Sequence, residues 1–131
     1  MEIRAGLKRV GLFDLEEARD QAERTGYAVF VIPHVIDRAS FFDAVRAVFP
    51  LDPPLLGSHS WDALSDSLWE GLSTHAAQRV AILWPNTKSM AISSPADFDM
   101  ALSVLTDLVN SLADPALTTG KPKEIAVLVE Y

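Results

Sequence analysis

Three continuous apolar segments constrain the fold of this chain more than any other feature of its sequence. They are YAVFVI at 27–32, RVAILW at 79–84 and IAVLV at 125–129, and none of them alternates regularly between apolar and polar residues. Strands buried on both faces have this pattern, and they occur in parallel sheets, where each connection must be long enough to hold a helix. The sequence therefore predicts an α/β fold in which helices pack on a mainly parallel, three-stranded sheet.

Helical patterns fill the segments between these strands. Before the first strand, a helix is predicted at 14–25, where Asp14 can serve as the N-cap and Gly26 can end the helix. After that strand, a second helix is predicted to begin near Asp37 or Ser40. Because helix-length segments separate the strands, the crossovers that a parallel sheet requires are available.

Two further helices and an additional strand complete the predicted fold. Ser60 can cap a helix that begins within SHSWDALSDSLWEGL, residues 58–72. Ser94 can cap a long helix whose first residue is Pro95. In that long helix, apolar residues recur at helical spacing at Phe98, Ala101, Leu102, Leu105, Leu108, Val109 and Leu112. The segment AGLKRV, at 5–10, can add a fourth strand at one edge of the sheet.

Length and composition favour a single soluble domain spanning residues 1–131. The chain has 131 residues, 49% of them hydrophobic, and contains no cysteine. This length supports one hydrophobic core, and a chain without cysteine has no disulfides or cysteine-bound zinc and suits a reducing compartment. No apolar stretch approaches the roughly 20 residues that a membrane-spanning helix needs, and no export signal is recognisable. We therefore expect a cytoplasmic protein that does not bind membranes.

The charge of the chain indicates which partners it can bind. The sequence has 18 acidic and 11 basic residues, which gives a formal net charge of −7. Such a charge repels phosphate backbones and attracts cationic proteins. We therefore expect no nucleic-acid binding and a basic partner.

Motifs for common enzyme and cofactor sites are absent. The sequence has no glycine-rich loop followed by Lys-Ser/Thr, no GxGxxG, no HExxH and no GxSxG. His34, His59 and His75 are predicted to lie in loops without a second ligand at a recognisable metal-binding spacing, so each is expected to be solvated. The sequence thus predicts neither a cofactor nor a metal site.

The segment at 58–72 has two distinct faces if it is helical. One face is apolar and suits a hydrophobic core: Trp61, Leu64, Leu68 and Leu72. The neighbouring face is acidic with one tryptophan: Asp62, Asp66, Trp69 and Glu70. Gly71 is expected to weaken this helix near its end. A core does not need the acidic face, which makes that face the main candidate for a functional surface.

Several interpretations of the acidic face are open. Asp62 lies in the first turn, where the helix dipole favours a carboxylate, whereas Asp66 gains little from the dipole and repels Asp62. The pair can be an ordinary solvated surface, or part of an interface in which Trp69 supplies buried area. Trp69 can equally pack beneath the next loop. With His59 nearby, the carboxylates can also be read as an acid/base pair, but catalysis needs pKa values separated by burial, so we expect a protein that is not an enzyme.

The order of these segments and the sequence of the acidic helix resemble the barstar family, the intracellular inhibitors of secreted bacterial ribonucleases. A proline-containing loop is followed by SHSWDALSDSL, a buried strand, a long amphipathic helix and a terminal strand. Family members carry a loop of the form P-x-x-(Y/F)-G-x-N-(W/L)-D-A-L-x-D-x-L before that strand. The resemblance spans about Leu7 to Tyr131 and implies a barstar-like fold, with residues 1–26 as an N-terminal extension of the kind found in longer relatives.

The resemblance also implies a binding site. In the family, the two motif aspartates enter the cationic active site of the ribonuclease in place of substrate phosphates, and they correspond to Asp62 and Asp66. The family's capping asparagine corresponds to Ser60, which can perform the same capping. A carboxylate on the long helix also touches the enzyme in some members, and Asp107 is its counterpart.

Three positions depart from the family motif. A loop aromatic is replaced by Leu56, a loop glycine by Ser58, and an aromatic before the second aspartate by Ser65. These changes reduce the hydrophobic part of a barstar-type interface, and Trp69, which lies outside the motif, can compensate. The residues expected to bind a partner are Asp62, Asp66, Trp69, Ser58, His59, Leu56, Ser65 and Asp107.

Taken together, these features predict a monomeric, barstar-like inhibitor or immunity protein that blocks a basic ribonuclease. The alternative is a non-enzymatic interaction module on the same fold that binds a different partner, for instance a nuclease of another type or a regulatory protein, because the three departures change the predicted surface.

Overall fold

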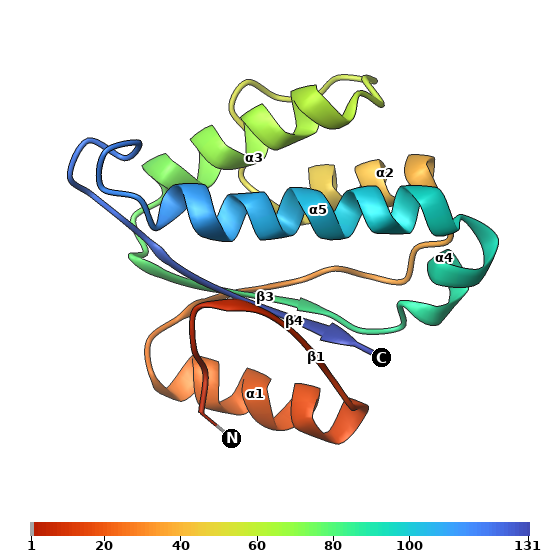
Figure 1. The fold of residues 1–131 in the computed structure, drawn as a ribbon, viewed down its shortest axis with the longest axis horizontal. Coiled ribbons are helices and arrows are strands. Elements are labelled where there is room, and N and C mark those ends of the chain that lie inside the picture. Colours follow the sequence, from red (N-terminus) through yellow and green to blue (C-terminus); the bar gives the residue numbers. More distant parts are fainter. Residues whose placement is uncertain (1) are drawn as a thin grey trace.

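In the computed structural model, which describes residues 2–131, helices cover both faces of a four-stranded sheet (Figure 1). Only residue 1 of the predicted domain lies outside this range. The strands are β1 (Gly6–Val10), β2 (Ala28–Val31), β3 (Arg79–Trp84) and β4 (Glu124–Glu130). The helices are α1 (Leu12–Arg24), α2 (Arg38–Val48), α3 (Trp61–Thr74), α4 (Lys88–Ser93) and α5 (Pro95–Leu112). The predicted α/β fold class is confirmed.

All neighbouring strands in the sheet are parallel, and their order is β1-β4-β3-β2. The predicted strand at 79–84 coincides with β3, whereas β2 is shorter than its predicted segment and β4 is one residue longer at each end. The predicted edge strand is also confirmed, because β1 pairs with β4 from Gly6 to Val10. The two central strands, β3 and β4, are buried along almost their whole length, as their continuous apolar sequences require.

The helices are distributed unequally over the two faces of the sheet. Figure 1 shows α1 alone on one face and α2, α3 and α5 on the other. The larger hydrophobic core lies on the side of these three helices. At its centre, four aromatic side chains pack with ring centroids 5.0 to 5.7 Å apart: Phe41, Phe42, Trp61 and Trp84. This aromatic group fixes the start of α3 against α2 and β3.

The start of α1 differs from the prediction. The helix begins at Leu12, its N-cap is Gly11 without a side-chain hydrogen bond, and Asp14 lies within the first turn. The predicted Asp14 cap is therefore wrong. The reason is that β1 ends at Val10 and the chain enters the helix directly, which leaves Leu12 exposed.

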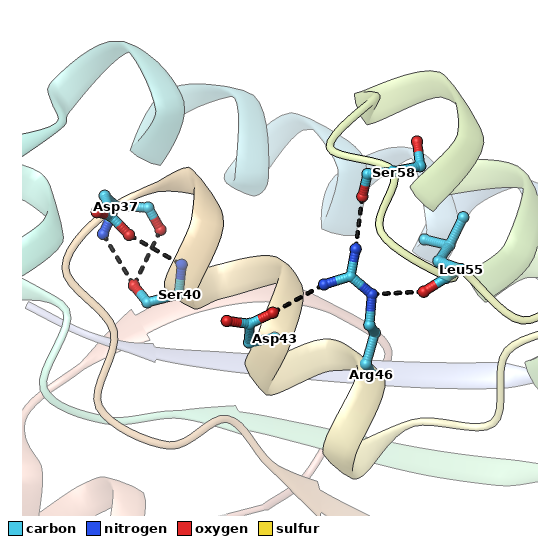
Figure 2. A network of polar contacts seen from close by, with 6 residues as sticks. All are labelled: Asp37, Ser40, Asp43, Arg46, Leu55 and Ser58. Atoms are coloured by element: carbon cyan, nitrogen blue, oxygen red, sulfur yellow. Dashed lines mark hydrogen bonds and ion pairs between the residues drawn. The ribbon is translucent and has the colours of Figure 1, made fainter.

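The caps of α2 and α3 follow the sequence closely. Asp37 is the N-cap of α2, its side chain accepts a hydrogen bond from the Ser40 backbone N–H, and the Ser40 side chain accepts one from Asp37 (Figure 2). Both predicted starting residues thus belong to one reciprocal capping arrangement. Ser60 caps α3, accepting a hydrogen bond from the Ala63 backbone N–H at 3.4 Å.

The short helix α4, which precedes α5, was not predicted from the sequence. It follows β3, and Met90 is its one buried residue. Ser94 then precedes Pro95 as predicted, but its hydroxyl donates to the Ile36 carbonyl at 3.2 Å and makes no capping bond. The helix boundary is therefore confirmed, and the side-chain cap is wrong.

Gly71 allows α3 to lie directly against the loop that precedes it. A Cβ atom at this position would lie 1.8 Å from the Pro50 carbonyl oxygen, a distance that no side chain can adopt. The glycine that weakens α3 in isolation is therefore required by the packing of the helix on the loop at 50–60. This contact places the beginning of the loop against the last turns of α3.

Candidate functional site

The candidate site is built on α3, whose apolar face holds the helix in the core. The four predicted apolar residues are buried: Trp61, Leu64, Leu68 and Leu72. Ser67 and Gly71 are buried beside them, which the sequence pattern did not indicate. Because this face is fixed, the direction of the opposite side chains is fixed as well.

Asp62 and Asp66 project from the outward face of α3, one turn apart. Both side chains are exposed, and neither has a hydrogen bond or an ion pair with any residue in the range 2–131. Asp62 lies in the first turn, where the helix dipole stabilises its charge, but Asp66 has no such compensation among the described residues. The surface therefore presents two carboxylates whose hydrogen-bonding capacity is fully open to a partner.

Trp69 lies partly inside the molecule. Its side chain is half-buried and packs against the larger hydrophobic core. Ser65, one turn earlier, is also half-buried. The structure therefore places part of Trp69 against the core, and its role in partner binding stays a prediction.

The loop before α3 presents a single large apolar side chain. Leu56 is 93% exposed, whereas the neighbouring Leu55 is buried at 7%. Ser58 is half-buried and His59 is exposed. Among the described residues of the loop at 50–60, Leu56 is therefore the large hydrophobic side chain that is exposed.

Arg46 of α2 binds this loop on both sides of its tip, as Figure 2 shows. Its guanidinium donates to the Leu55 carbonyl through Nε and to the Ser58 carbonyl through Nη2, the latter at 2.6 Å. Its third nitrogen, Nη1, donates to the Asp43 carboxylate at 2.8 Å. No sequence pattern indicated this role of Arg46, because a lone arginine in a helix carries no pattern that points to backbone carbonyls elsewhere.

Two other contacts hold the same loop. The Ser67 hydroxyl donates to the Pro53 carbonyl at 2.9 Å, and the Asp52 backbone N–H donates to the Ser67 carbonyl at 3.1 Å. Near the end of the loop, Arg38 lies over the Trp61 ring, with 5.6 Å from its Cζ to the ring centroid. The loop at 50–60 is therefore ordered by α2 and α3 together.

Asp107, the predicted carboxylate on the long helix, is exposed on α5. Its neighbour Leu108 is buried in the core, so the Asp107 side chain lies outside the packed face of the helix. Although α3 and α5 pack on each other, no contact joins Asp107 to Asp62 or Asp66 among the described residues. Its membership of the site stays a prediction.

The three histidines do not form a site. His34 is exposed and its ring is 3.0 Å from the Ser89 hydroxyl. His75 is half-buried against Phe30, and its Nδ1 accepts a hydrogen bond from the Ala77 backbone N–H at 3.0 Å, so the prediction of a solvated loop histidine is wrong there. Within residues 2–131, no group of three or more histidine, aspartate or glutamate side chains is placed to hold a metal ion.

The side chains with perturbed pKa values lie away from Asp62 and Asp66. Hydrogen bonds from Ser40 lower the pKa of the Asp37 carboxyl, which caps α2. Burial lowers the pKa of the Lys123 ammonium, which donates to the His75 and Ala77 carbonyls. Burial and the bond to Glu124 raise the pKa of the Tyr27 hydroxyl to about 12. Each of these groups is explained by its role in the fold.

The fold and this site define a small α/β protein with an exposed acidic helix beside an ordered loop. The family described as Barstar (barnase inhibitor) matches residues 25–129, which is most of the chain. The chain belongs to the Barstar family. The match begins after α1, so the family character of residues 1–24 stays a prediction.

The other comparisons add no relative. No curated protein and no solved structure matches the chain. In the described part of the chain, no helix has both the length and the apolar character needed to cross a bilayer.

Proposed function

We propose that this protein is an inhibitor that binds and blocks the active site of a basic ribonuclease through the outward face of α3. The observation that carries the proposal is the pair Asp62 and Asp66, which are exposed, held one turn apart, and without partners among the described residues. Carboxylates that the fold leaves unpaired can accept charge-assisted hydrogen bonds from arginine and lysine side chains.

The proposed mechanism is exclusion of substrate. A ribonuclease must bind the phosphates of RNA, so its cleft carries positive charge. Asp62 and Asp66 occupy the places of two such phosphates, while the bulk of α3 and its loop closes the cleft. The protein contributes no chemical step and acts by binding alone, in line with the family description as a barnase inhibitor.

Preorganisation favours this binding. The buried face of α3, the Ser60 cap and the contact at Gly71 fix the helix before any partner arrives. The two aspartates therefore lose little freedom on binding, which reduces the cost of association. The net charge of −7 adds a longer-range attraction toward a cationic partner, which salt screens over about 8 Å at physiological ionic strength.

The proposed setting is the cytoplasm, where an immunity protein protects the cell that makes the ribonuclease. The absence of cysteine fits a reducing compartment. We expect the free protein to be a monomer and to form a complex with one ribonuclease molecule.

A second candidate is an interaction module on the same fold with a different partner. Leu56, Ser58 and Ser65 replace residues of the family motif at three surface positions, and Leu56 is 93% exposed. A pull-down from native lysate separates the two candidates, because a small basic ribonuclease supports the first and an unrelated cationic protein supports the second.

The proposal is tested by measuring binding and inhibition of barnase by the full chain and three variants. Asp62→Asn and Asp66→Asn keep the shape of each side chain and remove its charge. Each is expected to weaken binding by about tenfold or more, because hydrogen bonds to charged groups contribute about 1.5–3 kcal/mol each. Asp20→Asn is the matched control, since Asp20 is an exposed acid of α1 on the other face of the sheet.

The Asp20→Asn control distinguishes binding at a specific site from attraction that depends only on net charge. If all three variants lose affinity equally, the attraction depends on net charge and not on α3. If wild-type protein neither binds nor inhibits barnase, the proposal fails for this ribonuclease. The hydrolase interpretation makes a different prediction, namely substrate turnover by the purified protein that Asp62→Asn abolishes.

A further inference from the structure

The tip of the loop before α3 is exposed and yet closely held at its base. Leu56 and Gly57 form the tip, and Gly57 adopts the positive φ of 101°, which favours glycine. Leu55 on one side of the tip is buried, and Ser58 on the other side is half-buried. The tip is therefore a short arch between two anchored positions.

Both anchored positions are bound by the same side chain. Arg46 donates from Nε to the Leu55 carbonyl and from Nη2 to the Ser58 carbonyl, so one guanidinium joins the two ends of the arch (Figure 2). The Arg46 side chain is only 22% exposed. Since these donors are charged, their hydrogen bonds to carbonyl oxygens are stronger than neutral ones.

The shape of guanidinium matters for this arrangement. Its nitrogens are fixed in one plane, so two of them can reach two carbonyls at the same time while a third binds a carboxylate. In this protein the third bond goes to Asp43, whose side chain is 74% exposed. A lysine at this position has one compact ammonium and cannot hold the same geometry.

The tip itself has no comparable support. Leu56 makes no contact that limits its exposure, and a Cβ atom added to Gly57 would meet nothing within 4 Å. The bonds of Ser67 hold the earlier part of the loop, at Asp52 and Pro53. Leu55 is also held by its burial in the core, and the Ser58 hydroxyl accepts a bond from the Ser60 backbone N–H at 3.2 Å. Among the described residues, Arg46 is the side chain whose hydrogen bonds join the two ends of the arch.

We propose that Arg46 is a positioning residue for partner binding: it fixes the Leu56 tip as a preformed apolar contact beside the acidic face of α3. The inference rests on the proposed function, because it assigns a role within that same interface. Arg46 itself does not need to touch the partner. Its contribution is to remove the freedom that the tip would otherwise lose on binding.

The first test needs no partner. Backbone NMR order parameters of Leu56, Gly57 and Ser58 are measured for the wild type, Arg46→Lys and Arg46→Met. The wild-type values are expected to be near 0.85, as in rigid backbone, and those of Arg46→Met to fall below about 0.6. Wild-type order in the Arg46→Met tip would overturn the proposal.

Asp43→Asn is the matched control for this test. It removes the charge that Arg46 pairs with and leaves both bonds to the loop carbonyls possible. The order parameters of the tip are expected to stay at wild-type values in this variant. Order parameters along β3 report on the whole fold and should be unchanged in all variants.

The second test uses barnase and a double-mutant cycle with Leu56→Ala. Arg46→Lys, which conserves charge, is expected to weaken binding by about tenfold when Leu56 is present and much less in the Leu56→Ala background. The dependence of affinity on salt should be the same for the wild type and Arg46→Lys, because the acidic face is intact. An equal loss in both backgrounds would overturn the positioning role.

The two tests separate this inference from the proposed function. Binding that depends on Asp62 and Asp66 but shows no coupling between Arg46 and Leu56 supports the proposed function and overturns the inference. If barnase does not bind the wild type, the proposed function fails for this ribonuclease, and the order parameters still decide whether Arg46 holds the tip.

Discussion

The helices α1 and α3 are both amphipathic and both carry acidic side chains, but the surroundings of these side chains differ. Each helix buries one face against the sheet or the core. The first helix has more acidic residues than the second, at Asp14, Glu16, Glu17, Asp20 and Glu23. However, α1 also contains arginine, and Arg19 pairs with Glu23 at 3.4 Å, whereas α3 contains no basic residue at all.

This difference shows that acidic content alone does not indicate a binding surface. On α1, Arg19 of the same helix supplies a counter-charge for Glu23, and the helix packs on the face of the sheet opposite to α2, α3 and α5 (Figure 1). On α3, Asp62 and Asp66 have no counter-charge among the described residues, and an ordered loop with one exposed leucine lies beside them. We infer that the second arrangement is the one suited to a partner.

The largest expected effect concerns the packing of α3 on its loop, which has no equivalent at α1. Gly71→Ala forces a Cβ atom into the Pro50 carbonyl and is expected to lower the free energy of unfolding by about 3 kcal/mol, through overpacking and backbone displacement. Gly11→Ala, before α1, is the control, because nothing lies within 4 Å of its Cβ position. Urea denaturation measures both, and equal stabilities would contradict the account of α3.

A smaller effect is expected on the α1 side, from the pH dependence of stability. Tyr27 follows α1 and is buried in the hydrophobic cluster between α1 and the sheet. Its hydroxyl donates to Glu124, and the Arg79 guanidinium lies over its ring. Its pKa in the folded state is raised to about 12, chiefly by burial and then by Glu124, above the ordinary value of 10.0. Below pH 10 both states keep the proton, and between pH 10 and 12 only the unfolded state loses it.

Stability is therefore expected to fall as the pH rises from 10 to 12, by an amount on the order of 2 kcal/mol. Denaturant titrations at several pH values measure this loss. Tyr27→Phe has no hydroxyl to ionise, so its stability should fall less over the same range. A decline as steep as that of the wild type would show that other groups cause the loss.

The smallest of these effects concerns the start of each helix. Ser60 caps α3 through its side chain, whereas Gly11 gives α1 no side-chain cap. Ser60→Ala is expected to lower stability by about 1 kcal/mol, while Gly11→Ala removes no capping hydrogen bond and is expected to have a smaller effect. Thermal unfolding of both variants tests this ranking. Equal melting temperatures for the two variants would show that the ranking is wrong.

Much of the fold could be predicted because its elements have strong local patterns. The three apolar segments predicted β2, β3 and β4. The expected burial on both faces is confirmed for β3 and β4 but wrong for β2, which is half-buried because it lies at the edge of the sheet. Asp37 and Ser60 were recognisable as caps because capping is a local interaction. The start of α1 was not predicted, because the chain passes directly from β1 into the helix without a side-chain cap. The short helix α4 was not predicted, because Met90 is its one buried residue and a single apolar position shows no helical spacing.

The candidate site could be predicted only in part. The outward direction of Asp62 and Asp66 follows from the spacing of the leucines that face the core. Arg46 could not be found in this way, because its partners are backbone carbonyls, which every residue has. The packing of Gly71 on the loop could not be predicted either, because the close approach of helix and loop depends on tertiary structure.

Hydrogen exchange of the full chain in the presence and absence of barnase tests the central claim most directly. The claim is that α3 and its loop, and not the more acidic α1, form the binding surface. We predict that binding slows exchange at residues 60–70 and leaves residues 12–24 unchanged. Slower exchange confined to 12–24, or none at 60–70 under conditions where barnase is bound, would contradict it.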